Sequence, residues 1–152
     1  MGIPTQEWLC QQIVANTQEA IIFTDRAGII QLWNMGAEII FGYQAAEVIG
    51  KSLDFIIPER LRDRHWEGYH RVMATGVTQY DRQLLAVPAI RKDGARISLE
   101  FTIVLIRDTQ DEVLGAAALL RDVTVRWQQE RELRARLAAL EGPHQPGPTN
   151  AP

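Results

Sequence analysis

Strand-like and helical patterns occupy separate blocks of this chain, and this order constrains the fold more than any other feature. Runs rich in β-branched and aromatic residues, bounded by turn residues, are typical of strands. The first two are joined by a turn that contains Gly28, as in a hairpin. Because strands and helices do not alternate singly, we expect an α+β fold with an antiparallel five-stranded sheet. The five strand-like runs are residues 20–25, 29–34, 83–90, 96–106 and 113–123.

The remaining segments carry helical signals. Apolar residues recur at helical spacing over 6–18, which predicts a short lead-in helix. Asn34 is a good N-cap for a core helix that Gly42 is placed to end. The longest middle helix is predicted over 59–74, after Pro58. A last helix is predicted over 124–141, supported by Glu and Arg residues four apart.

These patterns divide the chain into four parts. We expect an N-terminal flanking helix in residues 1–18, a folded domain in 19–123, a C-terminal signalling or coiled-coil helix in 124–141, and a disordered tail in 142–152. The tail is rich in Pro and Gly and has no apolar anchor. Leucines of the last helix keep coiled-coil spacing for only a short stretch, so the heptad signal is weak.

Composition excludes several classes of protein. The net charge is -3 and basic residues are scattered among acidic ones, so nucleic acid is not an expected partner. The single cysteine, Cys10, cannot form an internal disulfide or supply a thiolate zinc site. The sequence shows no leader and no run of roughly 20 apolar residues, so no membrane segment is expected. We expect a soluble cytoplasmic protein.

Three stretches, taken in order, resemble the PAS sensory domain family. They are DRAGIIQLWNMGAEIIFGYQAAEVIGKSLDFIIPE at 25–59, RKDGARISLEF at 91–101 and LLRDVTVRW at 119–127. The resemblance covers roughly residues 5–125. In that family the core helix opens at Asn34, the turn 92–94 joins two long strands, and Asp122 and Thr124 mark the passage into a signalling helix.

The resemblance implies a sensory module that binds a ligand and signals through another protein. Its sheet would be glove-like, with a pocket between the concave face and the covering helices. No output domain is visible in the sequence, so we expect either that the protein signals through a separate partner or that the sequence is a fragment. Asp25, Glu38, Glu47 and Asp54 form no recognisable acid/base set with His65, and we expect no enzyme.

Helical phase separates two histidines of the longest middle helix. At a period of ~3.6, His65 shares the apolar face with Leu61 and Tyr69, whereas His70 is rotated off it and should be partly solvated. His65 therefore points toward the core. A neutral imidazole is a good axial ligand of haem iron.

The context LRDRH also resembles the oxygen-sensing haem-PAS subfamily, which places the haem ligand at His65. The expected cofactor is thus haem b, with gas or redox sensing as the function. Gly68, one turn on, would leave room for a flat macrocycle. Tyr69 would line the pocket, with packing in the core or at its rim as the alternative. Arg71 occupies the place of a basic residue that pairs with a haem propionate in some members of that subfamily. A solvated or salt-bridged Arg71 is the alternative.

The other side of the expected pocket departs from the resemblance. Counted without gaps, Leu85 stands where oxygen sensors have a distal arginine, and Gln83 where some have a methionine. Leu85 cannot donate a hydrogen bond to bound dioxygen. We therefore expect an apolar pocket lined by Leu85, Ile103 and Leu119, favouring CO or NO over stable O₂.

Other readings stay open. A flavin or coumaroyl photosensor needs a reactive pocket cysteine, and Cys10 lies in the lead-in helix, so no flavin is expected. A lone helix histidine is more often a polar residue that hydrogen-bonds locally than a metal ligand. The alternative is a haem-free PAS module for dimerisation or protein interaction, with an empty or differently occupied pocket. In either case we expect a homodimer formed through the terminal helices.

Overall fold

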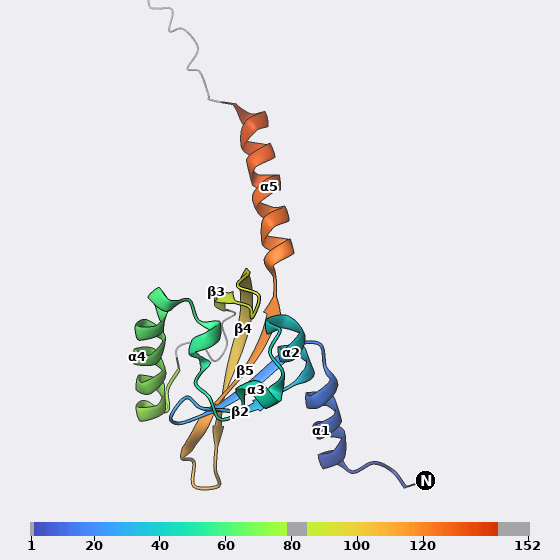
Figure 1. The fold of residues 1–152 in the computed structure, drawn as a ribbon, viewed down its shortest axis with the longest axis vertical. Coiled ribbons are helices and arrows are strands. Elements are labelled where there is room, and N and C mark those ends of the chain that lie inside the picture. The colour runs from blue at the N-terminus through green and yellow to red at the C-terminus, as the bar shows by residue number, and fades with distance from the viewer. Residues whose placement is uncertain (1, 79–84, 143–152) are drawn as a thin grey trace, which may run out of the picture. The chain divides into compact units, whose positions relative to one another are not determined.

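A computed structural model describes residues 2–78 and 85–142 of the chain. It comprises two compact units, residues 1–122 and 123–152, and each is described by itself. The first unit contains the whole sheet and all helices but the last (Figure 1). The block order of the elements agrees with the order expected from the sequence.

The sheet is five-stranded and antiparallel, in the order β2-β1-β5-β4-β3. β5 is central and pairs with both β1 and β4. Pro88 lies in β3, an edge strand, so its missing N–H interrupts no hydrogen bonds between inner strands of the sheet. The strands are β1 Ala20–Asp25, β2 Ile30–Trp33, β3 Leu85–Ile90, β4 Arg96–Arg107 and β5 Val113–Asp122. The α+β fold expected from the sequence is therefore confirmed.

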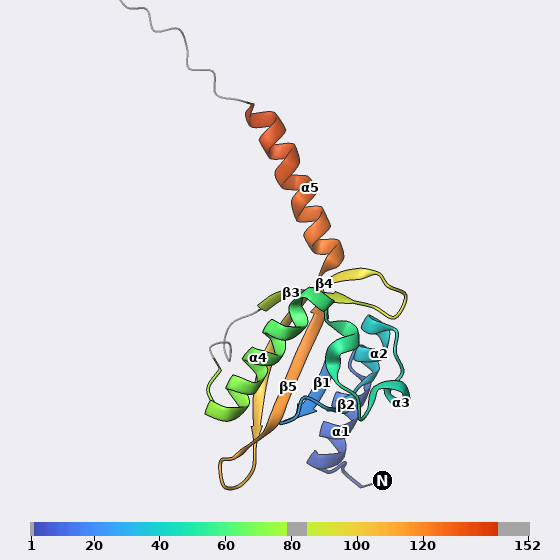
Figure 2. The ribbon, with the colours of Figure 1, turned by 60° about the vertical axis from the view of Figure 1, so that its left-hand side comes forward.

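Short helices connect the first hairpin to the second group of strands. Figure 2 shows α4 and the smaller helices in front of the sheet. α4 ends at Gly76, which adopts the left-handed conformation with φ 66°. The helices of this unit are α1 Gln6–Asn16, α2 Met35–Phe41, α3 Ala45–Val48, the 3₁₀ helix η1 Leu53–Ile56 and α4 Glu59–Thr75.

Asn34 joins three of these elements. Its Oδ1 accepts hydrogen bonds from the N–H groups of Ala37 at 3.0 Å and Ile21 at 2.8 Å. Its Nδ2 donates to the carbonyls of Val14 and Glu19. One buried amide thus caps α2 and holds β1 and the end of α1 beside it, as expected of an N-cap asparagine.

The hydrophobic core lies between the helices and one face of the sheet, here called the inner face. Side chains of a strand alternate between the two faces, so Ala20, Ile22 and Thr24 of β1 point inward and are buried. The core cluster comprises Ala20, Ile22, Ile30, Trp33, Ala37, Ile40, Phe41, Val48, Ile56, Ala89, Ile97, Leu99 and Leu120.

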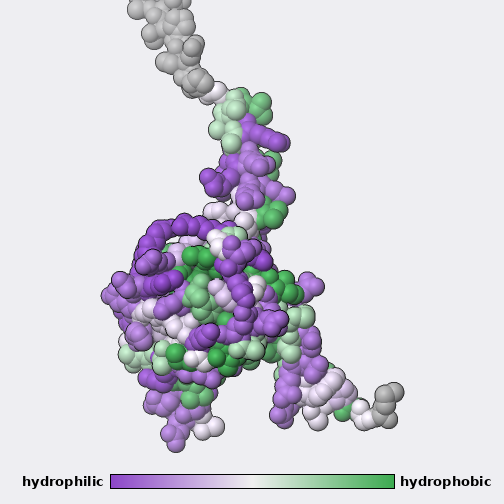
Figure 3. All heavy atoms as spheres, in the orientation of Figure 1, coloured by the Kyte–Doolittle hydropathy of each residue, from purple (hydrophilic) through white to green (hydrophobic). Residues whose placement is uncertain are grey.

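The second unit contains α5, Thr124–Glu141, which has no buried residue. Leu133 and Leu137 are each 58% exposed. Figure 3 shows hydrophobic and hydrophilic side chains mixed along this helix. Arg126 and Glu130 form an ion pair one turn apart, at 3.7 Å. Among the described helices of both units, none combines the length and the apolar character that a membrane crossing needs.

Candidate functional site

The inner face of α4 carries the candidate site. Leu61, His65 and Tyr69 are partly buried, and Met73 is buried. His70 is exposed. Helical phase thus places the two histidines as the sequence indicated, because residues four apart share a helix face and residues five apart do not.

His65 is half-buried in an aromatic environment. Its ring meets Trp66 edge-on at 4.6 Å and is stacked toward Tyr69 at 6.2 Å between centroids. Burial lowers the pKa of His65 from its ordinary value of 6.5, while the charge of Asp54 acts in the opposite direction. The neutral imidazole is favoured, which is the form that binds a metal.

One atom of His65 has an unusual position. Its Nδ1 is buried and has no hydrogen-bond partner among residues 2–78 and 85–142. Buried polar atoms of proteins are nearly always hydrogen-bonded, so an unsatisfied one requires an explanation such as a ligand. His65 therefore has an unused ring nitrogen in the protein interior.

Trp66 anchors α4 to η1 and to the first hairpin. Its Nε1 donates to Oδ1 of Asp54 at 2.6 Å. Its ring lies over Gly28, where a Cβ atom would be 2.2 Å from Cζ3 of the tryptophan. Gly28 also has φ 81°, so both the turn and the close approach require glycine.

Tyr69 anchors the next turn of α4 to β1. Its hydroxyl lies 2.9 Å from Oγ1 of Thr24 and is within hydrogen-bond distance of the carbonyls of Thr24 and Asp25. Burial raises the pKa of Tyr69, and the hydrogen bond with Thr24 opposes this. The phenol is therefore neutral, and it bridges the helix and the inner face of the sheet.

Two other predicted residues of α4 differ in their surroundings. A Cβ atom at Gly68 would have no atom within 4 Å, so the helix surface there is open. Arg71 is exposed and pairs with Glu67 at 3.3 Å. The structure thus shows the salt-bridged alternative for Arg71 and leaves its role toward a propionate a prediction.

The residues predicted for the opposite wall do not share one face of the sheet. Ile103 pairs with Ala118 and is partly buried. Leu119 pairs with Thr102 and is therefore on the other face, where it is 36% exposed. The placement of Leu119 in the pocket was wrong, because a shift of one residue along a strand reverses the side-chain direction.

Some predicted positions are only partly described. The backbone of Leu85 pairs with Phe101, and its side chain, like the whole of Gln83, lies outside the described part of the chain. Ile103 lines a hollow of ≈ 360 Å³ together with Gly76. Cys10 is exposed on α1 and lines another hollow, of ≈ 540 Å³, against α2.

The α4 cluster meets two requirements of a haem site. It offers a neutral, half-buried imidazole with an unsatisfied nitrogen, and an open helix surface at Gly68. A haem-binding role would use His65 as the axial ligand and Gly68 as the surface against which a flat ring lies. Trp66 and Tyr69 already occupy the space between α4 and the first hairpin.

Sequence reasoning did not identify two polar partners of this cluster. Thr24 could have been found, because it continues the inward alternation of Ala20 and Ile22 and a polar residue at such a position needs a partner. Asp54 gave no comparable signal, since its contact with Trp66 joins residues that are twelve apart across a break in secondary structure.

These observations define a small α+β domain in which helices cover one face of an antiparallel sheet and leave a half-buried polar cluster beneath α4. The chain belongs to the PAS family, whose sequence model, described as PAS fold, matches residues 9–123. It is thus a PAS sensory domain of signal transduction.

Similar proteins support this class. The chain is 27% identical over 144 residues to the sensor protein FixL of Bradyrhizobium diazoefficiens, covering 92% of this chain and 26% of FixL. It is 27% identical over 112 residues to the oxygen sensor protein DosP of Escherichia coli, covering 74% of this chain and 14% of DosP. A solved PAS domain from Colwellia psychrerythraea, 22% identical, superposes with a TM-score of 0.66 over 76% of this chain and 95% of that domain. The chain spans about a quarter or less of these two sensors.

Proposed function

We propose that this PAS domain binds haem b against α4, with His65 as the axial ligand of the iron, and that it senses a gas or a redox change. The observation that carries the proposal is the buried Nδ1 of His65, which has no partner among the described residues. Buried polar atoms are nearly always hydrogen-bonded, so a buried imidazole nitrogen without a partner is available to bind a metal ion. One similar protein, DosP, is an oxygen sensor, which points the same way.

Different residues would have different roles at such a haem site. His65 would hold the iron and stays neutral because it is buried. Gly68 would leave the helix surface clear, and Ile103 would face the ring from the sheet. When bound, haem supplies an iron that can bind a diatomic gas or change its oxidation state.

The output is proposed to pass through the C-terminal helix to another protein. β5 ends at Asp122 and α5 begins at Thr124, so a change in β5 reaches α5 along the chain. To signal, a ligand must bind two states of this junction unequally. We propose a non-enzymatic cytoplasmic role as a homodimer formed through α1 and α5, whose exposed apolar side chains would be covered in the dimer.

A haemin titration followed by absorption tests the cofactor. We expect the wild-type protein to take up one haem per chain with a sharp Soret band at micromolar concentration. His65→Ala should lose that band because the axial ligand is removed. His70→Ala is the matched control, since it removes an exposed histidine of the same helix and should bind as the wild type does.

Two outcomes would count against the proposal. One is the absence of saturable haem uptake by the wild-type protein. The other is equal uptake by wild type and His65→Ala, which would place any haem elsewhere.

A haem-free interaction module is the second candidate, and a specific observation favours it. Trp66 and Tyr69 are already hydrogen-bonded to Asp54 and Thr24, so α4 is held on the first hairpin without any ligand. Under this alternative the protein dimerises or binds a partner, and its pocket holds nothing or another small molecule. It predicts that the protein takes up no haem and that adding haemin does not change its oligomeric state.

A further inference from the structure

Two arginines connect the C-terminal end of α4 to the hairpin between β4 and β5. Arg26, in the turn after β1, donates from Nη2 to the carbonyl of Met73 at 3.3 Å and from Nη1 to the carbonyl of Val113 at 2.7 Å. Met73 belongs to the last turns of α4, and Val113 is the first residue of β5. One guanidinium thus joins the helix and the start of the central strand.

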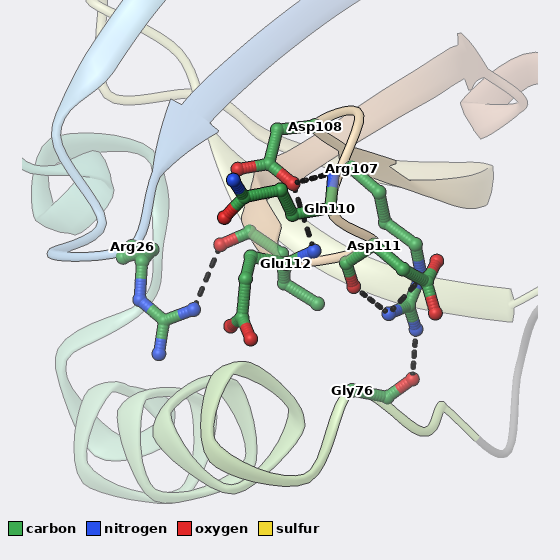
Figure 4. Close-up of polar contacts among 8 residues, drawn as sticks. Arg26, Gly76, Arg107, Asp108, Gln110, Asp111 and Glu112 are labelled. Carbon is green, nitrogen blue, oxygen red and sulfur yellow. Dashed lines mark hydrogen bonds and ion pairs between the residues drawn. The ribbon is translucent and has the colours of Figure 1, made fainter.

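Arg107, at the end of β4, makes the same kind of connection. Its Nη2 donates to the carbonyl of Gly76 at 2.5 Å and its Nη1 to the carbonyl of Asp111 at 2.9 Å. Figure 4 shows its guanidinium between these two carbonyls. The two arginines come from different hairpins. In each, one guanidinium nitrogen donates to a carbonyl at the C-terminal end of α4 and another donates to a carbonyl of the hairpin 107–113.

The end of α4 suits these contacts. The last carbonyls of a helix lack intrahelical partners and carry partial negative charge, so a guanidinium is a favourable partner. The last turn of α4 has no basic residue of its own. Arg26 and Arg107 therefore supply, from other elements, the cationic cap that the helix sequence lacks.

The hairpin is shaped to receive them. Asp111 has φ 64° and is the only non-glycine residue with a positive φ among those described. Oδ1 of Asp108 accepts from the N–H groups of Gln110 at 2.8 Å and Glu112 at 2.9 Å, which fixes the turn. The ladder between β4 and β5 also changes register between Ile106 and Arg107.

We infer that Arg26 and Arg107 couple the position of α4 to the start of β5, and so form the route by which a ligand at α4 acts on the strand that leads to α5. The inference rests on the proposed function only for the ligand that displaces α4. The coupling itself is a property of the protein without ligand. A test could therefore disprove the coupling and leave haem binding intact, or disprove haem binding and leave the coupling intact.

Native-state amide hydrogen exchange in a mutant cycle tests the coupling. Asp108→Ala loosens the hairpin turn by removing two hydrogen bonds. The readout is the Gly76 amide, which donates to Val72 in the last turn of α4. Coupling predicts that Asp108→Ala speeds exchange at Gly76 about fivefold or more, although it touches no residue of α4.

The same change is then made in a protein that lacks both bridges, Arg26→Met with Arg107→Met. Methionine keeps much of the apolar stem and removes the guanidinium. In this background Asp108→Ala should speed exchange at Gly76 much less, because the energetic interaction between two sites falls when the contacts that join them are removed. Arg26→Lys with Arg107→Lys, which keeps the charge but loses the two-armed donor, serves if the methionine variant does not fold.

Asp93→Ala is the matched control. Oδ1 of Asp93 fixes the turn between β3 and β4 by accepting from the N–H of Ala95 at 2.9 Å, and this turn has no arginine bridge to α4 in the described structure. It should not change exchange at Gly76. The inference is overturned if Asp108→Ala leaves Gly76 unaffected, or if its effect is the same with and without the arginines.

Discussion

The protonation of His65 links the site to stability. Burial lowers the pKa of the folded-state imidazole below its ordinary value of 6.5. The unfolded chain therefore binds a proton more readily, and this group costs stability as the pH falls through 6.5 toward the folded-state pKa. Above 6.5 both states are neutral and the cost vanishes.

We therefore predict that haem-free protein loses more stability between pH 7.5 and pH 5.5 than His65→Gln does. Urea unfolding at the two pH values measures the difference. An equal pH dependence of the two proteins would show that His65 is not held neutral by the fold. The nearby charge of Asp54 opposes the shift, and Asp54→Asn should therefore increase the difference.

Gly68 gives a residue-scale test that separates stability from binding. A Cβ atom there meets no other atom, so Gly68→Ala should stabilise α4 by about 0.5–1 kcal/mol, the usual cost of glycine within a helix. If a haem lies on this surface, the added methyl group should also weaken haem uptake. Unfolding and haemin titration measure the two effects. Higher stability with unchanged uptake would remove Gly68 from the site.

Individual residues were predictable where one periodic rule applied. Asn34 was recognised as a cap, and helical phase separated His65 from His70. Leu119 failed because its face depends on strand register, which a run of small and apolar residues such as VLGAAALL does not reveal. Contacts between distant segments, such as Tyr69 with Thr24, need the tertiary fold.

At the scale of elements, the two terminal helices are the least buried of the described helices. α1 and α5 have no buried residue, and Ile13 and Leu133 are 65% and 58% exposed. Their bounds were nevertheless close to those expected from the sequence, because caps and helical spacing are local signals. Local signals place a helix along the chain but do not say which surface it packs against.

We predict that the full chain is a dimer and that removing residues 1–18 or 125–152 weakens it. The physical reason is that exposed apolar side chains on both helices would be buried between two copies. Light scattering over a range of concentrations measures the change. A full chain that remains monomeric at high concentration, with the truncated proteins unchanged, would contradict the homodimer.

At the scale of the molecule, block order and turn residues were sufficient to predict the α+β sheet and its edge strand. They did not predict how α4 is held. Its contacts run through side chains of Trp66 and Tyr69 and through the bridges of Arg26 and Arg107.

We propose that His65 is the ligand of a haem bound to α4, and chemical rescue is the sharpest test of this assignment. The measurement is the absorption spectrum of His65→Gly with haemin, before and after imidazole is added, beside His70→Gly. We expect no stoichiometric Soret band for His65→Gly, its return with imidazole, and a wild-type spectrum for His70→Gly. A His65→Gly protein that binds haem as the wild type does, without imidazole, would contradict it.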